Sequence, residues 1–202
     1  IYSDINILEG GHSLLFSIND SKILYIKNYF DLPLININTN KSNLIEEGRY
    51  LLNDSVKLRM RSDVPVGAFL SGGLDSTSIV GEMKNFIDIE KLHTFSIGFD
   101  DIKFDETKYI KIAKNHYKTN HHHHIFDKKD FFNRLNIYAK YFDEPFADYS
   151  ALAGFKVSEM ASNYTKVVLS GDGGDEIFGG YPIYNAGLLY DKLLFIPKNV
   201  RK

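Results

Sequence analysis

The spacing of hydrophobic and polar residues changes character near residue 43. Before it, two short β-prone runs at residues 14–18 and 22–26 are separated by the turn residues 19–21. This pattern predicts a β-hairpin. Because two or three strands alone bury little apolar surface, we expect the hairpin to be part of a larger sheet. The polar residues 34–41 that follow are typical of a linker.

After residue 43, segments with helical periodicity alternate with short apolar runs. The helical segments are residues 43–61, a segment ending near Met83, and residues 105–116, 131–142 and 150–162. The β-prone runs between them are residues 66–70, 93–99, 121–126 and 166–169. Strands separated by helices are typical of βαβ units. The sequence therefore predicts an α/β domain with a parallel sheet and right-handed crossovers.

Two helix starts can be assigned more closely. Asn43 and Glu46 have the spacing of a capping box, which predicts that the first helix begins at Asn43. Asp105 is the expected N-cap of a later helix. The apolar face predicted for that later helix consists of Tyr109, Ile112, Ala113 and His116.

Composition narrows the class of protein. The 202 residues suit one domain, or one domain with a short appendage. The net charge of −2, from 24 basic and 26 acidic side chains, favours neither nucleic acid nor a membrane as a partner. No apolar run approaches the roughly 20 residues of a membrane-spanning helix. The cysteine count of zero excludes a disulfide scaffold, a thiolate metal site and a cysteine nucleophile within these residues. Because the first residue is Ile1, we expect a piece of a longer protein.

A glycine-rich string follows the predicted strand 66–70. It reads Ser71-Gly72-Gly73-Leu74-Asp75-Ser76 and leads into a helix. Backbone N–H groups at such a turn can converge on an anion, and the two glycines allow a close approach. The Lys-Ser/Thr ending of a Walker A loop is absent. A tight turn would explain Ser-Gly-Gly alone, but the full string after a buried strand favours a phosphate-binding loop.

A second string, Ser170-Gly171-Asp172-Gly173-Gly174-Asp175-Glu176, follows the predicted strand 166–169. In an open α/β sheet, ligands bind beyond the carboxyl ends of the strands, where both strings lie. Carboxylates beside a phosphate-binding loop would repel a polyanion unless a divalent cation bridges them. Oxygen ligands without cysteine indicate Mg²⁺. The alternative is a solvated acidic turn, in which Asp175 and Glu176 only complement a helix dipole.

Longer strings around both loops resemble the synthetase domain of glutamine-dependent asparagine synthetases. These strings are residues 63–76 and 170–181, and further matches follow in the family's order at residues 94–99, 104–106, 121–124 and 143–148. The resemblance covers roughly residues 42–190 and implies the adenine-nucleotide α-hydrolase-like (HUP, ATP pyrophosphatase) fold. Residues 1–35 resemble the last strands of the family's N-terminal, Ntn-type glutaminase domain. Residues 36–202 would then be the first part of the ATP-pyrophosphatase domain.

The resemblance implies a reaction and a set of site residues. In the family, the side-chain carboxylate of aspartate is converted by ATP to β-aspartyl-AMP, and ammonia from glutamine then displaces AMP to give asparagine. Carried over to this sequence, Asp172 and Asp175 would be catalytic, and Asp75 and Asp175 would bind Mg²⁺. Many family members have Glu at the position of Asp172. The implied contacts to pyrophosphate are Ser71, Gly72, Gly73, Asp75 and Ser76, and those to adenosine are Leu70, Ile97, Ser170 and Gly171.

The resemblance also implies a cytoplasmic ligase of amino-acid biosynthesis. Its partners would be the small molecules ATP, aspartate and ammonia, with a homodimer of the full-length protein left open. The fragment alone is expected to be inactive, because it has no glutaminase nucleophile and the family's further substrate contacts would follow Lys202. Two alternatives remain. One is a relative that adenylates another carboxylate, like β-lactam synthetases or peptide-cyclising enzymes, and the other is a non-catalytic nucleotide-binding module.

The run His121–His124 has the composition of a metal-binding tract. It lies on a predicted strand, where adjacent side chains point to opposite faces. We therefore expect structural or solvent-exposed histidines there, and the sequence assigns them no role.

Overall fold

The computed structural model describes residues 3–32, 41–142, 146–148 and 150–192. The chain divides into two compact units, Ile1–Glu46 and Glu47–Lys202, and each is described by itself. Nearly all of the predicted linker, and the predicted domain boundary at residue 35, lie outside the described residues. Within the described ranges, no helix is long and apolar enough to cross a membrane.

The first unit contains the predicted hairpin. Strands β1 (His12–Ser17) and β2 (Lys22–Asn28) pair antiparallel, with an irregularity in the register between Leu15 and Phe16. The apolar side chains of both strands stay 40–55% exposed, so neither face of the hairpin is buried. An isolated two-stranded ribbon of this kind is marginally stable at best.

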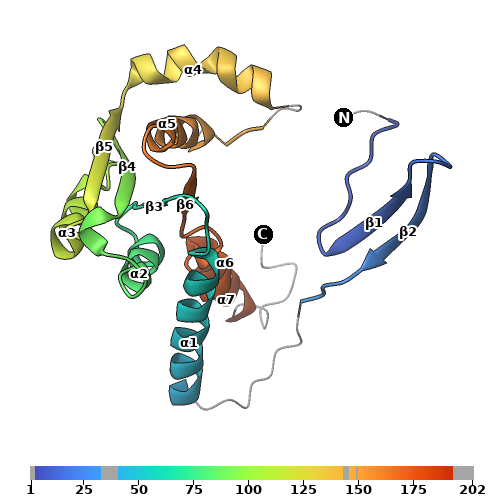
Figure 1. The fold of residues 1–202 in the computed structure, drawn as a ribbon, viewed down its shortest axis with the longest axis horizontal. Helices are drawn as coiled ribbons and strands as arrows, with labels where there is room; N and C mark the ends of the chain where they lie inside the picture. Colours follow the sequence, from blue (N-terminus) through green and yellow to red (C-terminus); the bar gives the residue numbers. More distant parts are fainter. Residues whose placement is uncertain (1–2, 33–40, 143–145, 149, 193–202) are drawn as a thin grey trace. The chain divides into compact units, whose positions relative to one another are not determined.

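The second unit is built on the predicted parallel sheet (Figure 1). Its strands are β3 (Val66–Phe69), β4 (His93–Phe99), β5 (Asn120–Phe126) and β6 (Val167–Leu169). They lie in the order β5-β4-β3-β6, and all neighbouring pairs are parallel. The chain moves outward from β3 to β5 and then returns to the other side of β3. This reversal of direction places a topological switch point between β3 and β6, and ligands bind at such points.

Helices cover both faces of this sheet (Figure 1). On one face lie α1 (Lys41–Arg59), α2 (Leu74–Met83) and α3 (Thr107–Tyr117). On the other face lies α5 (Ser150–Ser162), and α4 (Lys128–Tyr141) packs against α5. The remaining helices are the short 3-10 turn η1 (Ile89–Lys91), α6 (Gly174–Phe178) and α7 (Pro182–Lys192).

The main buried cluster lies between β3 and the helices α1, α2 and α3. Val56 of α1 and Val80 and Met83 of α2 pack against β3 and the residue after it, Leu70. Removing such side chains from water contributes roughly 1.5–3 kcal/mol each. On the opposite face, Phe95 of β4 lies beside the rings of His122 and Tyr164. Phe95 also lies against Gly67 of β3, where an added Cβ would be 2.9 Å from a carbon of its ring, so β3 is covered on both faces.

Three local predictions need correction. Helix α1 begins at Lys41, so Asn43 lies inside it and cannot be its N-cap. The N-cap of α3 is Glu106, while Asp105 precedes it and accepts a hydrogen bond from the Thr107 N–H. The buried face of α3 carries Ile110 and Ala113, whereas Tyr109 and Ile112 are 56% and 60% exposed. Ile110, Ala113 and Tyr117 have helical spacing as well. Ala113 and Tyr117 pack in the cluster that includes β3, and Ile110 is buried.

Candidate functional site

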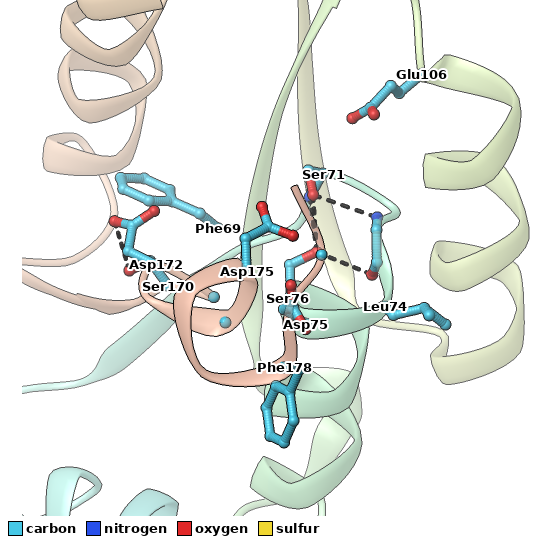
Figure 2. Close-up of a pocket in the computed structure, with 14 residues that line it drawn as sticks. Phe69, Ser71, Leu74, Asp75, Ser76, Glu106, Ser170, Asp172, Asp175 and Phe178 are labelled. Carbon is cyan, nitrogen blue, oxygen red and sulfur yellow. Dashed lines mark hydrogen bonds between the residues drawn. The ribbon is translucent and has the colours of Figure 1, made fainter. Parts of the chain in front are cut away.

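The loop after β3 is held in shape by its own serines. Ser76 Oγ accepts the Ser71 N–H at 3.2 Å and lies 2.9 Å from Ser71 Oγ, which in turn accepts the Gly73 N–H at 3.3 Å (Figure 2). Gly73 is the N-cap of α2, and it offers no side chain to cap the helix. The first N–H groups of α2 therefore lack the usual capping acceptor and can receive an anion.

Gly72 allows this loop to turn tightly against α3. Its φ is +83°, a conformation that favours glycine. A Cβ at this position would lie 2.5 Å from the backbone nitrogen of Ile110. Gly72 therefore shapes the loop, although it is not among the residues that line the cavity next to it.

The loop after β6 lies directly against the first loop. A Cβ on Gly174 would lie 2.4 Å from Cγ of Asp75, so only glycine permits this close approach. Gly171 in the same loop lies beside the backbone of Ser76. The pairing of β3 with β6 causes this contact, because the ends of the two strands are neighbours in the sheet. The two motifs, separated by about a hundred residues, thus form one site.

The two loops enclose a cavity of about 610 Å³, which we call the phosphate cavity (Figure 2). Eight of the predicted site residues line it: Ser71, Gly73, Asp75, Ser76, Ser170, Gly171, Asp172 and Asp175. The other predicted contacts are elsewhere: Leu70 is fully buried in the core, and Ile97 is not among the lining residues. Their contact with adenosine stays a prediction.

The sequence assigned no role to the six other residues that line this cavity, which are Phe69, Leu74, Glu106, Gly174, Phe178 and Gly180. Glu106 stands at the start of α3, and its carboxylate points toward the side of the cavity where Ser71 and Asp175 lie (Figure 2). A signal that could have found Glu106 is its place in the loop that follows β4, the strand next to β3.

The charged side chains that line the phosphate cavity are all acidic. Four carboxylates line it, those of Asp75, Glu106, Asp172 and Asp175, and none of its described lining residues is a lysine, arginine or histidine. A triphosphate placed here would meet like charge unless cations accompanied it. The phosphate cavity therefore suits a metal-bound polyphosphate.

Two acidic side chains of the second motif have local partners. Ser170 Oγ donates to Asp172 Oδ2 at 2.9 Å, which orients that carboxylate (Figure 2). Glu176 accepts a hydrogen bond from Tyr181 Oη at 3.0 Å and is absent from the cavity lining. The same hydrogen bond to Glu176 raises the pKa of Tyr181. Of the acidic residues in the motif, Asp172 and Asp175 thus belong to the phosphate cavity.

The carboxylates fit a magnesium ion that is shared with a ligand. In the described part of the chain, no three His, Cys, Asp or Glu side chains are close enough to hold a metal by themselves. Mg²⁺ commonly takes one or two carboxylates and completes its shell with phosphate oxygens and water. Asp75 and Asp175, which face one cavity from α2 and α6, match that arrangement.

The four adjacent histidines have four different surroundings. His121 Nδ1 lies 2.9 Å from Thr94 Oγ1, and His122 Nε2 lies 2.9 Å from His93 Nδ1. His123 is 3.5 Å from Thr107 Oγ1, and His124 is 2.6 Å from a carboxylate oxygen of Asp130. The side chains alternate between the two faces of β5, as the strand prediction required.

We expect His121 to weaken the fold in acid. Burial lowers its pKa from 6.5 to about 4, and Lys114 adds to the effect. The unfolded chain binds this proton near pH 6.5 and the folded chain only near pH 4, so stability is lost as pH falls between these values. Because the ring is partly exposed, we expect the free energy of unfolding to fall by roughly 1–2 kcal/mol.

Thermal unfolding of the full-length protein should be measured between pH 7.5 and 4.5. The melting temperature should decline less over this range in His121→Gln than in the wild type. His116→Gln, which changes an exposed ring, is the control, and an unchanged decline in His121→Gln would contradict the assignment.

Comparison with known proteins identifies the family. The family described as asparagine synthase matches residues 47–199. The chain is 51% identical over its full length to "Putative asparagine synthetase (glutamine-hydrolyzing) 2" of Methanocaldococcus jannaschii, covering 39% of that protein. It is 36% identical to asparagine synthetase (glutamine-hydrolyzing) 1 of Bacillus subtilis, with 93% of this chain and 29% of that protein covered.

Among solved structures, the NH3-dependent NAD synthetase of Campylobacter jejuni overlaps 71% of this chain and 61% of its own, with a TM-score of 0.42 and 14% identity. That likeness is too low to carry an argument. The chain spans well under half the length of the two asparagine synthetases. The family match covers both loops of the phosphate cavity and most of the second unit. The chain therefore belongs to the asparagine synthase family.

Proposed function

We propose that the full-length protein is an ATP-dependent ligase that makes asparagine from aspartate and ammonia. In the first step, an oxygen of the aspartate side-chain carboxylate attacks the α-phosphorus of ATP, and pyrophosphate leaves. In the second step, ammonia attacks the acyl carbon of β-aspartyl-AMP, AMP leaves, and the nitrogen loses a proton. The observation that carries the proposal is the phosphate cavity, in which an uncapped helix start faces carboxylates from a second loop.

The residues of the phosphate cavity have separate tasks in this proposal. The loop from Ser71 to Ser76 binds the pyrophosphate part of ATP through its N–H and hydroxyl groups. Asp75 and Asp175 would hold Mg²⁺, which supplies positive charge to the phosphates. Asp172, oriented by Ser170, acts at the acyl carbon during adenylate formation and the attack of ammonia. Such positioned groups act mainly through charge and orientation.

Ammonia would come from glutamine by way of another part of the full-length protein. The 202 residues include no cysteine to serve as a glutaminase nucleophile. We assign the hairpin of β1 and β2 to the end of a glutaminase domain, because its apolar side chains are exposed on both faces and need a larger sheet. A cytoplasmic location and a homodimer stay predictions.

Pyrophosphate exchange in the full-length protein tests the proposal. With MgATP and labelled pyrophosphate, L-aspartate should support formation of labelled ATP, and ammonium should convert the adenylate to asparagine. The ammonium reaction should persist when the glutaminase nucleophile is removed. Exchange with other carboxylates but not with aspartate would favour a relative with another substrate. ATP binding without exchange for any carboxylate would favour a nucleotide-binding module.

A further inference from the structure

A second cavity, of about 500 Å³, lies beyond the ends of β4 and β5. Phe99 and Phe126, the last residues of these two strands, form one wall, and Phe104 and Phe131 line it as well. We call it the aromatic cavity. Its size and its mainly apolar lining with a few polar groups are typical of small-molecule sites. Its place at the carboxyl ends of parallel strands is where ligands of open α/β sheets bind.

The aromatic cavity adjoins the phosphate cavity. Glu106 lines both of them, so one carboxylate stands at the junction. The neighbouring Asp105 fixes this position: its Oδ1 accepts the Phe99 N–H at 3.3 Å and the Thr107 N–H at 3.2 Å. The pKa of Asp105 is lowered mainly by a hydrogen bond from the Thr107 hydroxyl, and also by those from the two backbone N–H groups. The end of β4 and the start of α3 are thereby tied together around Glu106.

The charged side chains that line the aromatic cavity are one lysine, Lys128, and three carboxylates, those of Asp100, Glu106 and Asp127. Lys128, at the start of α4, lines it and forms no ion pair with any described residue. Glu106 occupies the N-cap position of α3, but its side chain accepts no capping hydrogen bond from the helix. Asp127, by contrast, is engaged in the capping box of α4. A ligand that carries both an ammonium and a carboxylate group would complement Glu106 and Lys128.

We propose that the aromatic cavity binds the amino-acid substrate of the ligase as a zwitterion. Glu106 accepts hydrogen bonds from the α-ammonium group, and Lys128 pairs with the α-carboxylate. The phenylalanine rings enclose the carbon chain, and the side-chain carboxylate reaches past Glu106 into the phosphate cavity. The inference rests on the proposed function, and it adds the residues that select an α-amino acid from other carboxylic acids.

Truncated substrates test each contact. Succinate is aspartate without the ammonium group, and β-alanine is aspartate without the α-carboxylate. In pyrophosphate exchange by the full-length protein, Glu106→Gln should lower kcat/KM for aspartate about 10- to 100-fold, the usual cost of losing a hydrogen bond between charged groups. The same variant should lower exchange with succinate much less, so that the preference for aspartate over succinate falls about 10-fold or more. Lys128→Met should lower kcat/KM for aspartate to a similar degree and leave kcat/KM for β-alanine nearly unchanged.

Two control variants separate this inference from general damage. Lys129→Met changes the next lysine, which does not line the aromatic cavity, and Glu90→Gln changes an exposed carboxylate of η1. Both should keep wild-type exchange with aspartate. Equal losses for aspartate and for its truncated analogue in Glu106→Gln or Lys128→Met would overturn the assignment. If the wild type showed no exchange with aspartate, the proposed function itself would fail; normal exchange that neither variant changes would remove only the aromatic cavity from the mechanism.

Discussion

Replacing Asp175 with asparagine should lower amide formation by the full-length protein about 10³-fold and raise the Mg²⁺ concentration needed for half-maximal activity. Asp175 lies in the first turn of α6 and lines the phosphate cavity together with Asp75. Since none of the described residues that line the cavity is a lysine or an arginine, we expect cations to neutralise the charge of bound phosphates. Loss of one ligand to such a cation removes several kcal/mol of charge stabilisation.

The next residue provides a matched control for this experiment. Glu176 has the same charge and also lies in the first turn of α6, but it accepts a hydrogen bond from Tyr181 and does not line the cavity. Glu176→Gln should therefore keep the wild-type dependence on Mg²⁺, with activity within a few-fold. Activity should be measured across a Mg²⁺ titration at saturating ATP. If Asp175→Asn kept both normal turnover and normal metal dependence, Asp175 would not belong to the magnesium site.

Asp172→Asn should reduce amide formation about 10²-fold or more and change ATP affinity much less. The carboxylate of Asp172 lines the phosphate cavity and is oriented by Ser170. A positioned acid–base or electrostatic group typically contributes 10²- to 10⁴-fold to the chemical step. The loop from Ser71 to Ser76, which we expect to bind the phosphates, does not depend on this side chain. Asp172→Glu should be the mildest substitution, since it keeps the charge.

Amide synthesis and equilibrium binding of ATP must be measured on the same Asp172 variants. A large loss of synthesis with nearly normal binding supports a role at the acyl carbon. Parallel losses in both measurements would instead make Asp172 a residue of nucleotide or metal binding. Ser170→Ala provides a graded comparison, because it removes the hydrogen bond to Asp172 and leaves the carboxylate in place. We expect a smaller loss of synthesis there.

Local sequence patterns predicted most of the secondary structure of the second unit. The four strands β3, β4, β5 and β6 lie within a residue or two of the predicted runs, and α5 spans the predicted residues 150–162. Hydrophobic periodicity and strand-to-helix turns depend on neighbouring residues, which is why they can be read without a structure. The pattern did not predict α7 (Pro182–Lys192), whose apolar side chains Ile183, Leu188 and Leu189 remain 59–69% exposed.

The errors at α1 and α3 arise where several local signals compete. The side chains of α3 offer two overlapping apolar stripes, and the pattern alone does not decide between them. Packing placed Ala113 in the cluster with α2 and β3, buried Ile110, and left Tyr109 and Ile112 outside. At α1, the helix begins two residues before Asn43, so the capping-box spacing of Asn43 and Glu46 lies inside the helix. Tertiary contacts often override such weak local preferences.

By itself, the sequence determined which chemical groups the chain carries and where along it they lie. It supplied a glycine-rich loop after a buried strand, a second loop rich in carboxylates, and no cysteine. Only the tertiary structure decided which of these groups meet. The order β5-β4-β3-β6 brings Gly174 against Asp75 and adds Glu106 from the loop that follows the neighbouring strand β4. The reason is physical: composition and periodicity are local, whereas strand order is set by contacts between residues far apart in the chain.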